Sequence, residues 1–123
     1  MSDTASVVPG QVSDAHRELL DQVLDKWSLL ILDKLCEQPR RFNGLRRAIP
    51  EVSQKSLTTA LRRLERNGMI ARVVVSTRPL AVEYRIAALG ETLQDLIDAL
   101  LQWTSVHMDE VTIARDRFDT ETD

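Results

Sequence analysis

Residues 53–67 read SQKSLTTALRRLERN, and Gly68 follows them directly. Ser53 is of a residue type that caps the beginning of a helix, and glycine is the residue type that most often ends one. At about 100° per residue on an ideal helix, four apolar side chains fall on one stripe. They are Leu57, Ala60, Leu61 and Leu64. The stretch therefore predicts an amphipathic helix that packs on a core through its leucines.

The opposite face of this predicted helix carries cations and small hydroxyl groups. Its members are Lys55, Thr59, Arg62 and Arg66, flanked by Ser56 and Arg63. Guanidinium and ammonium groups can reach phosphates or guanine edges, and Ser and Thr can approach either closely. With no carboxylate among them, these side chains suit a DNA major groove, although many basic helix faces are only solvated surface.

Length and composition indicate one ordinary globular domain. The chain has 123 residues, of which 43% are hydrophobic and 28% are charged, which suffices for a single core. No apolar run is long enough to span a bilayer, and the first residues lack the pattern of a secretion signal. The single cysteine, Cys36, allows no intrachain disulfide. We expect a cytoplasmic protein with no membrane partner.

The net charge of −3 hides a strongly uneven distribution. Residues 38–85 hold eleven of the sixteen Lys and Arg but only three of the nineteen Asp and Glu, so this segment carries +8 and the rest −11. Attraction to phosphate depends on the local field and not on the total charge. A basic middle between acidic flanks is therefore compatible with nucleic-acid binding.

The segments before the opening stretch complete a helix-turn-helix order. Apolar residues recur at helical spacing over residues 14–37, which predicts one long helix or two abutting ones, the second deeply buried. Asn43–Ile49 predicts a short helix with Asn43 as its cap, and residues 51–52 form the turn into the next helix. Two helices joined by a turn, the second with a basic outer face, are typical of DNA-binding modules.

A β-hairpin is predicted after this pair. Residues 70–76 are strand-like in composition, residues 82–86 alternate as a half-buried strand does, and residues 77–80 form the turn. Residues 40–42 could add a very short strand. A hairpin directly after the basic helix would be a wing, and Arg78 near its tip could reach phosphate or a minor groove, or could be an ordinary exposed arginine.

The last predicted helix runs from Ala88 to about Ala114 and has a wide apolar band. Left in water such a band is unfavourable, so we expect a second copy of the chain, together with residues 14–24, to cover it. The alternative is that the helix folds back on its own domain. The predicted dimer interface comprises Leu20, Val23, Leu24, Leu93, Leu96, Leu100 and Trp103. Residues 1–13 are expected to be a loose arm and residues 115–123 a frayed acidic tail, which leaves 14–114 as the domain.

Six motifs follow one another along the chain: KWSLLIL at 26–32, RFNGLRRAIP at 41–50, VSQKSLT at 52–58, LRRLERNGMI at 61–70, VEY at 82–84 and LG at 89–90. In this order they resemble the HxlR-type bacterial transcriptional regulators, from about Asp14 to Trp103. The resemblance implies a mostly α (α+β) winged helix-turn-helix with a two-stranded wing and with N- and C-terminal dimerisation helices. It also implies a homodimer that binds an inverted repeat in double-stranded DNA.

The resemblance assigns roles residue by residue. Candidates for contact with bases or nearby phosphates are Gln54, Lys55, Ser56, Thr58, Thr59 and Arg62. Arg63 and Arg66 are expected to touch phosphate or solvent, and Arg46 and Arg47 belong to the helix that crosses the backbone. Thr77 and Arg78 belong to the wing.

Two departures from the family pattern concern sensing and helix continuity. Many members carry a cysteine that serves in some as a redox or electrophile sensor. In this chain the corresponding position lies near Asp14, where there is no cysteine. The usual glycine pair is replaced by Leu24-Asp25, which predicts a more continuous pair of N-terminal helices. Cys36 is expected to be a packed thiol, because a sensor would require an exposed thiol with a low pKa.

Other function classes have little support in the sequence. A winged-helix module that binds a protein in place of DNA stays open as the alternative. No catalytic order, phosphate loop or metal-ligand spacing is present, so we expect neither an enzyme nor a cofactor. An unidentified small-molecule effector could bind between the last helix and the core around Trp27.

Overall fold

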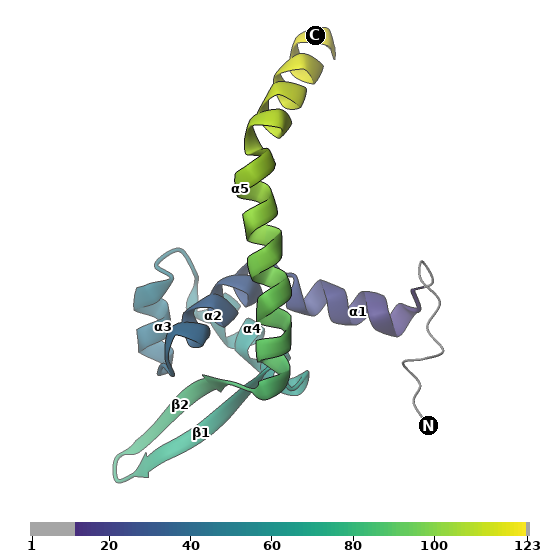
Figure 1. Ribbon diagram of the computed structural model, residues 1–123. Coiled ribbons are helices and arrows are strands. Elements are labelled where there is room, and N and C mark those ends of the chain that lie inside the picture. Colours follow the sequence, from purple (N-terminus) through teal and green to yellow (C-terminus); the bar gives the residue numbers. More distant parts are fainter. Residues whose placement is uncertain (1–11, 123) are drawn as a thin grey trace.

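The computed structural model describes residues 12–122, which form five helices and one antiparallel pair of strands (Figure 1). In chain order they are α1 (Asp14–Val23), α2 (Lys26–Glu37), α3 (Phe42–Ala48), α4 (Gln54–Arg66), β1 (Ile70–Thr77), β2 (Leu80–Ile86) and α5 (Ala88–Thr122). The mostly helical winged helix-turn-helix predicted from the sequence is confirmed. None of the helices in the described part of the chain is long and apolar enough to cross a membrane.

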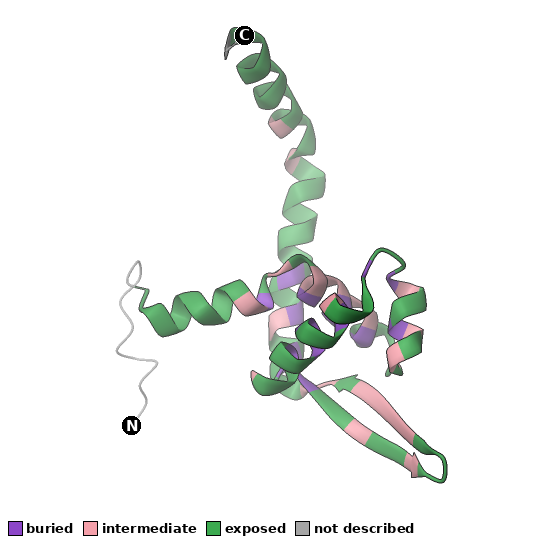
Figure 2. Ribbon diagram, turned by 180° about the vertical axis from the view of Figure 1, so that it is seen from behind, coloured by how far each residue is buried: buried purple, intermediate pink, exposed green. Residues whose placement is uncertain are grey.

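The core lies where α2, α3, α4 and the beginning of α5 meet (Figure 2). Its fully buried side chains are Ile31, Leu32, Leu35, Leu45, Leu57, Leu61 and Leu64, with Ser28 beside them. The leucine stripe of α4 and the apolar residues Ile31, Leu32 and Leu35 of α2 are therefore buried as predicted. Most of α1 and the distal part of α5 lie outside this core and are exposed.

The expected continuity of the two N-terminal helices is wrong. Helix α1 ends at Val23, and a separate helix α2 begins at Lys26. Asp25 caps α2: its carboxylate accepts hydrogen bonds from the Trp27 N–H at 3.2 Å and the Ser28 N–H at 3.3 Å. The Ser28 hydroxyl donates to the Gln22 carbonyl at 2.9 Å and fixes the corner. A short carboxylate that satisfies free backbone donors favours a new helix start.

The beginning of α3 also differs from the prediction. Asn43 does not cap it, because the helix already begins at Phe42 with Arg41 in the cap position and no side-chain cap bond. The short strand expected at residues 40–42 is reduced to a single bridge between Arg40 and Tyr84, because Phe42 belongs to the helix.

Both predicted ends of α4 are confirmed. The Ser53 hydroxyl accepts a hydrogen bond from the Ser56 N–H at 3.0 Å. Gly68 has a φ of 78°, which glycine adopts without strain, and its N–H donates to the Glu65 carbonyl at 3.0 Å. Just before this turn, the Asn67 side-chain amide donates to Gln22 Oε1 at 2.9 Å and thereby connects α4 to α1.

The hairpin extends away from the helices and is attached to α2 at its base (Figure 1). β1 and β2 pair from Ile70↔Ile86 to Thr77↔Leu80, with an irregularity between Val74 and Ser76, so the turn is shorter than predicted and contains only residues 78–79. At the base, Arg40 and Tyr84 exchange backbone hydrogen bonds of 3.0 and 2.7 Å.

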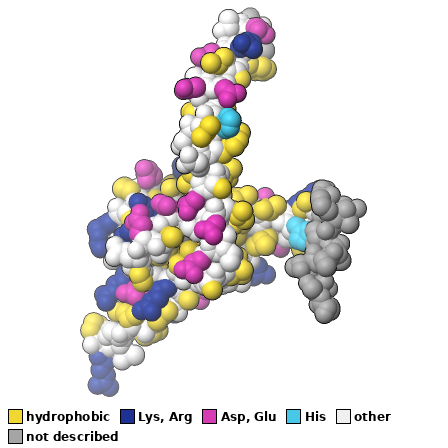
Figure 3. All heavy atoms as spheres, viewed as in Figure 1, with side chains coloured by type: hydrophobic (Ala, Val, Ile, Leu, Met, Phe, Trp, Pro, Cys, Tyr) yellow, Lys and Arg dark blue, Asp and Glu magenta, His cyan; other side chains and the backbone are white. Residues whose placement is uncertain are grey.

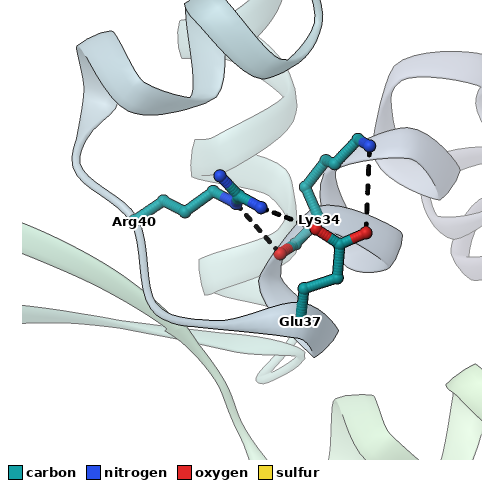
Figure 4. Close-up of polar contacts among 3 residues, drawn as sticks. All are labelled: Lys34, Glu37 and Arg40. Atoms are coloured by element: carbon teal, nitrogen blue, oxygen red, sulfur yellow. Dashed lines mark hydrogen bonds and ion pairs between the residues drawn. The ribbon is translucent and has the colours of Figure 1, made fainter.

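The Arg40 side chain completes this attachment (Figure 4). Its Nε donates to the Lys34 carbonyl at 3.1 Å, and its guanidinium pairs with the Glu37 carboxylate at 2.6 Å. Lys34 Nζ lies 3.9 Å from the same carboxylate. Charge-assisted bonds of this kind are stronger than neutral ones, so the end of α2 holds the base of the wing.

The chain ends differ from the expected boundaries. Most of the arm predicted for residues 1–13 lies outside the described residues, and Ser13 already caps α1 by accepting a bond from the His16 N–H. The tail expected to fray from residue 115 is instead the last part of α5, which is helical to Thr122. The prediction of a frayed tail from its acidic composition is therefore wrong.

Gly90 lets the first turn of α5 approach the segment between α4 and β1. A Cβ on Gly90 would collide with the Met69 carbonyl oxygen and would lie 2.9 Å from Ile86 Cγ1. We expect Gly90→Ala to lower the free energy of unfolding by about 1–3 kcal/mol, because the backbone must shift.

Gly44→Ala is the matched control, because its Cβ would meet nothing closer than 3.8 Å. Within α3 this change should raise the free energy of unfolding by about 0.5–1 kcal/mol. Urea denaturation followed by circular dichroism measures both values. Equal effects of the two substitutions would show that the close approach at Gly90 is unimportant.

Candidate nucleic-acid interface

The outer face of α4 presents most of the predicted DNA contacts to solvent. The exposed residues are Gln54, Lys55, Thr58, Thr59, Arg62, Arg63 and Arg66. Ser56 is only half-buried, and its N–H is engaged by the Ser53 hydroxyl. Because the leucines of the same helix are buried, the rotation of α4 about its axis is fixed and this face must point outward.

The remaining candidates lie on two neighbouring elements. Arg46 and Arg47 are exposed on α3, where they line a shallow depression of about 310 Å³ that extends to Pro50. Thr77 and Arg78 are exposed at the end of the hairpin, which reaches out from the helical body (Figure 1). The predicted residues thus occupy three separate elements, and those on the wing lie at its far end.

Most cations of the basic segment are free of carboxylate partners. Arg40 pairs with Glu37, and Arg85 pairs with Glu83 at 3.0 Å. Within residues 12–122, none of the other nine Lys and Arg of segment 38–85 has a carboxylate within 4.0 Å. Figure 3 shows dark blue side chains over α3 and the hairpin and magenta ones over α5. The uneven charge of the sequence is therefore uneven in space as well.

A groove of about 510 Å³ lies between α4 and the wing. Gln54, Thr58, Arg62 and Glu65 line it from α4, Arg72 from β1 and Tyr84 from β2. Two of these residues were missed by sequence reasoning. Arg72 was counted only as part of the basic segment, since its orientation depends on the strand register. Glu65 brings a carboxylate into a groove beside a face that the sequence had suggested to be free of them.

The residues predicted for dimerisation differ in exposure. Val23 is 3% exposed and belongs to the core of its own subunit, so this prediction requires correction. Leu93 is half-buried against the same core, and its role at the interface stays a prediction. The others are exposed in the single subunit: Leu20 at 47%, Leu24 at 44%, Leu96 at 67%, Leu100 at 51% and Trp103 at 53%. Only the first part of α5 folds back onto its own domain, so the rest of its apolar band stays uncovered in the single subunit.

Cys36 is exposed, so the prediction of a packed thiol is wrong. Partial desolvation of the thiol and, after it, the charges of Asp98 and Asp33 raise the pKa of Cys36 above its usual value. The thiolate is the reactive form, so this environment disfavours reaction at neutral pH. The described residues contain no group of His, Cys, Asp and Glu that could hold a metal ion.

We expect Cys36 to react slowly with iodoacetamide at neutral pH, at a rate below that of free cysteine, because its raised pKa leaves less thiolate. The rate should rise about tenfold per pH unit until the pKa is reached. Mass spectrometry of the alkylated chain measures this. Cys36→Ser should also leave any effect of oxidants on DNA binding unchanged, and a lost oxidant response would assign a sensing role to this thiol.

The chain is similar in sequence and in fold to known helix-turn-helix regulators. Residues 22–112 match the family model described as HxlR-like helix-turn-helix. The uncharacterized HTH-type transcriptional regulator YtfH of Escherichia coli K12 is 39% identical over 100 residues, which cover 81% of this chain and 79% of that protein. A solved structure of the transcriptional regulator ytfH from Salmonella typhimurium has a TM-score of 0.72 and 37% identity, covering 81% of this chain and 89% of that one.

A third similar protein is a redox regulator. The structure of HypR in its reduced form has a TM-score of 0.72 and 29% identity, and it covers 80% of this chain and 98% of that one. The match to the family model spans the helix-turn-helix, the wing and most of α5. The chain therefore belongs to the HxlR-like helix-turn-helix family.

Proposed function

We propose that this protein, a DNA-binding transcriptional regulator, acts as a homodimer on an inverted-repeat operator. The observation that carries the proposal is the outer face of α4, which is exposed, cationic and without carboxylate partners in the described residues. Two such faces related by a two-fold axis would read two half-sites of opposite direction. Because its partner is DNA, we place the protein in the cytoplasm.

In this proposal α4 lies in the major groove. Gln54, Lys55, Ser56, Thr58, Thr59 and Arg62 approach bases or nearby phosphates, and Arg63 and Arg66 face phosphate or solvent. Arg46 and Arg47 on α3 follow the backbone, and Thr77 and Arg78 at the wing tip reach phosphate or the adjacent minor groove. Support comes from the exposure of these side chains, with Ser56 half-buried, and from the leucines that fix α4 on the core.

We infer that α1 and α5 form the dimer interface. Leucines on α1 and the exposed part of the apolar band of α5 remain in contact with water in the single subunit, which costs about 25 cal/mol for each Å² of apolar surface left uncovered. A large exposed apolar patch is typical of an interaction surface. The acidic side chains over α5 are separate from the basic ones over α3 and the hairpin, so they would lie away from the DNA (Figure 3).

We further propose that a small-molecule effector binds beside α5. An apolar groove of about 450 Å³ lies between α2 and α5, lined by Leu29, Leu30, Ile97, Leu100 and Leu101, with Lys26 and Asp33 at its rim. Its position agrees with the expected pocket beside the last helix, but Trp27 lines a different hollow, next to α4. An apolar effector bound here would compete with a second subunit for Leu100.

Selection of bound sequences from random double-stranded DNA tests the function directly. We expect an inverted repeat whose half-sites are about 10–10.5 base pairs apart, or a multiple of that spacing. Capture of a protein partner by a chain that shows no DNA affinity at low salt would instead favour the protein-interaction module.

Arg62→Ala should weaken binding to the selected operator by about 1–3 kcal/mol if the guanidinium reads a base, and should relax selectivity at one position of each half-site. Competition binding with single-base variants of the operator measures this. Arg85→Ala is the control, because that arginine is engaged by Glu83 on the hairpin. A uniform loss across all sequences would reassign Arg62 to phosphate.

The double substitution Leu96→Glu and Leu100→Glu should convert the dimer to a monomer, because two carboxylates would be buried without partners. Operator affinity should fall as well, since one subunit binds without the effective concentration supplied by the other. Leu80→Glu is the control: this leucine is as exposed as Leu96, at 67%, but lies on the wing. Light scattering after size exclusion measures the molar mass of each variant. A double variant that stayed dimeric would contradict the proposal.

A further inference from the structure

We propose that the groove between α4 and the wing holds one sugar-phosphate strand of the DNA, with Arg72 as a phosphate ligand and Glu65 as an opposing charge. The inference rests on the proposed function, since it names a further contact of the same interface. Arg72 belongs to none of the positions that the family pattern assigns to DNA.

The strand register directs Arg72 into this groove. Arg72 is paired with Tyr84 across the hairpin, and directly paired residues of neighbouring strands point to the same face of the sheet. Both residues line the groove. Arg85 is paired with Ala71, so it lies on the opposite face, where it binds Glu83 through contacts of 3.0 and 3.2 Å.

The two walls of the groove carry cations from different elements. Arg62 stands on α4 and Arg72 on β1, both are exposed, and neither has a carboxylate within 4.0 Å in the part of the chain that the structure describes. When a helix lies in the major groove, the edges of that groove are sugar-phosphate backbones. A wing that runs beside the helix must therefore have one of these backbones between itself and the helix.

The polar groups of the groove suit a sugar-phosphate backbone. Tyr84 and Phe42 line it beside the two arginines, and Gln54 and Thr58 supply neutral hydrogen-bonding groups on the α4 side. Phosphate contacts of this kind come from Arg, Thr, Gln and Tyr side chains alike and carry no sequence information directly. Arg72 therefore contributes affinity for DNA of every sequence.

Glu65 makes the groove electrostatically mixed. It follows Arg62 by three residues, so the two side chains are neighbours on the surface of α4, and its carboxylate is exposed. A negative charge beside a phosphate path is repulsive and weakens binding at low salt most. Glu65 thus holds the affinity of this groove below the value that its arginines alone would give.

The test measures binding of the full chain to the selected operator and to an unrelated duplex over a range of salt concentrations. Arg72→Ala should weaken binding to both duplexes by similar factors and reduce the slope of log K against log salt by about 0.9. Arg72→Lys should keep the slope, because it keeps the charge. Glu65→Gln should strengthen binding to both duplexes, by the larger factor at low salt.

Arg85→Ala is the matched control, since it removes an arginine from the same hairpin but from the face that Glu83 occupies. It should leave the slope unchanged, and circular dichroism checks that every variant is folded. If the unchanged protein binds neither duplex, the proposed function itself fails. If it binds but Arg72→Ala behaves like Arg85→Ala, or loses affinity only for the operator, the phosphate role of Arg72 is overturned.

Discussion

The burial of three leucines from α4 is the interaction on which the rest of the structure depends. Leu57, Leu61 and Leu64 are completely or almost completely removed from water against α2 and its neighbours. Since the side chains of a helix are fixed relative to one another, burying this stripe also fixes the direction of the opposite one. The cations therefore face outward as a mechanical result of packing, and no separate interaction is needed to orient them.

Positive and negative charges are concentrated on different elements. The basic segment 38–85 forms α3, α4 and the hairpin, whereas α5 carries many of the acidic residues (Figure 3). Only Arg40 and Arg85 of this segment are paired with carboxylates within the described residues. A chain with a net charge of −3 can thus present a strongly positive surface, because local charge and not the total determines the field close to the protein.

Local signals in the sequence predicted most of the fold. For α4, the spacing of the leucines and the flanking residues Ser53 and Gly68 were sufficient to predict the helix and its ends, because capping and helix ending depend on neighbouring residues alone. The predictions failed where competition between local and distant contacts decides the structure. Asp25 caps α2 and so divides a segment whose apolar pattern is continuous, and Val23 lies in the core of its own subunit. The acidic end of α5 remained helical although its composition had suggested fraying.

The candidate site shows the same limit. The exposed face of α4 could be read from spacing, but Arg72 and Glu65 come together only through the hairpin register and the position of the wing beside α4. Cys36 illustrates the opposite case, since its position near the end of an apolar helix suggested burial, whereas the final turn of α2 leaves the core and exposes it.

The attachment of Arg40 to the end of α2 has a mechanical consequence for the hairpin. The base of the wing is fixed by two backbone hydrogen bonds, a side-chain bond to a carbonyl and an ion pair. Any bending of the hairpin therefore displaces the turn at Arg78 much more than Arg72, which lies close to the base. The inner part of the wing keeps its position relative to α4, whereas its outer end can move to follow a groove of variable width.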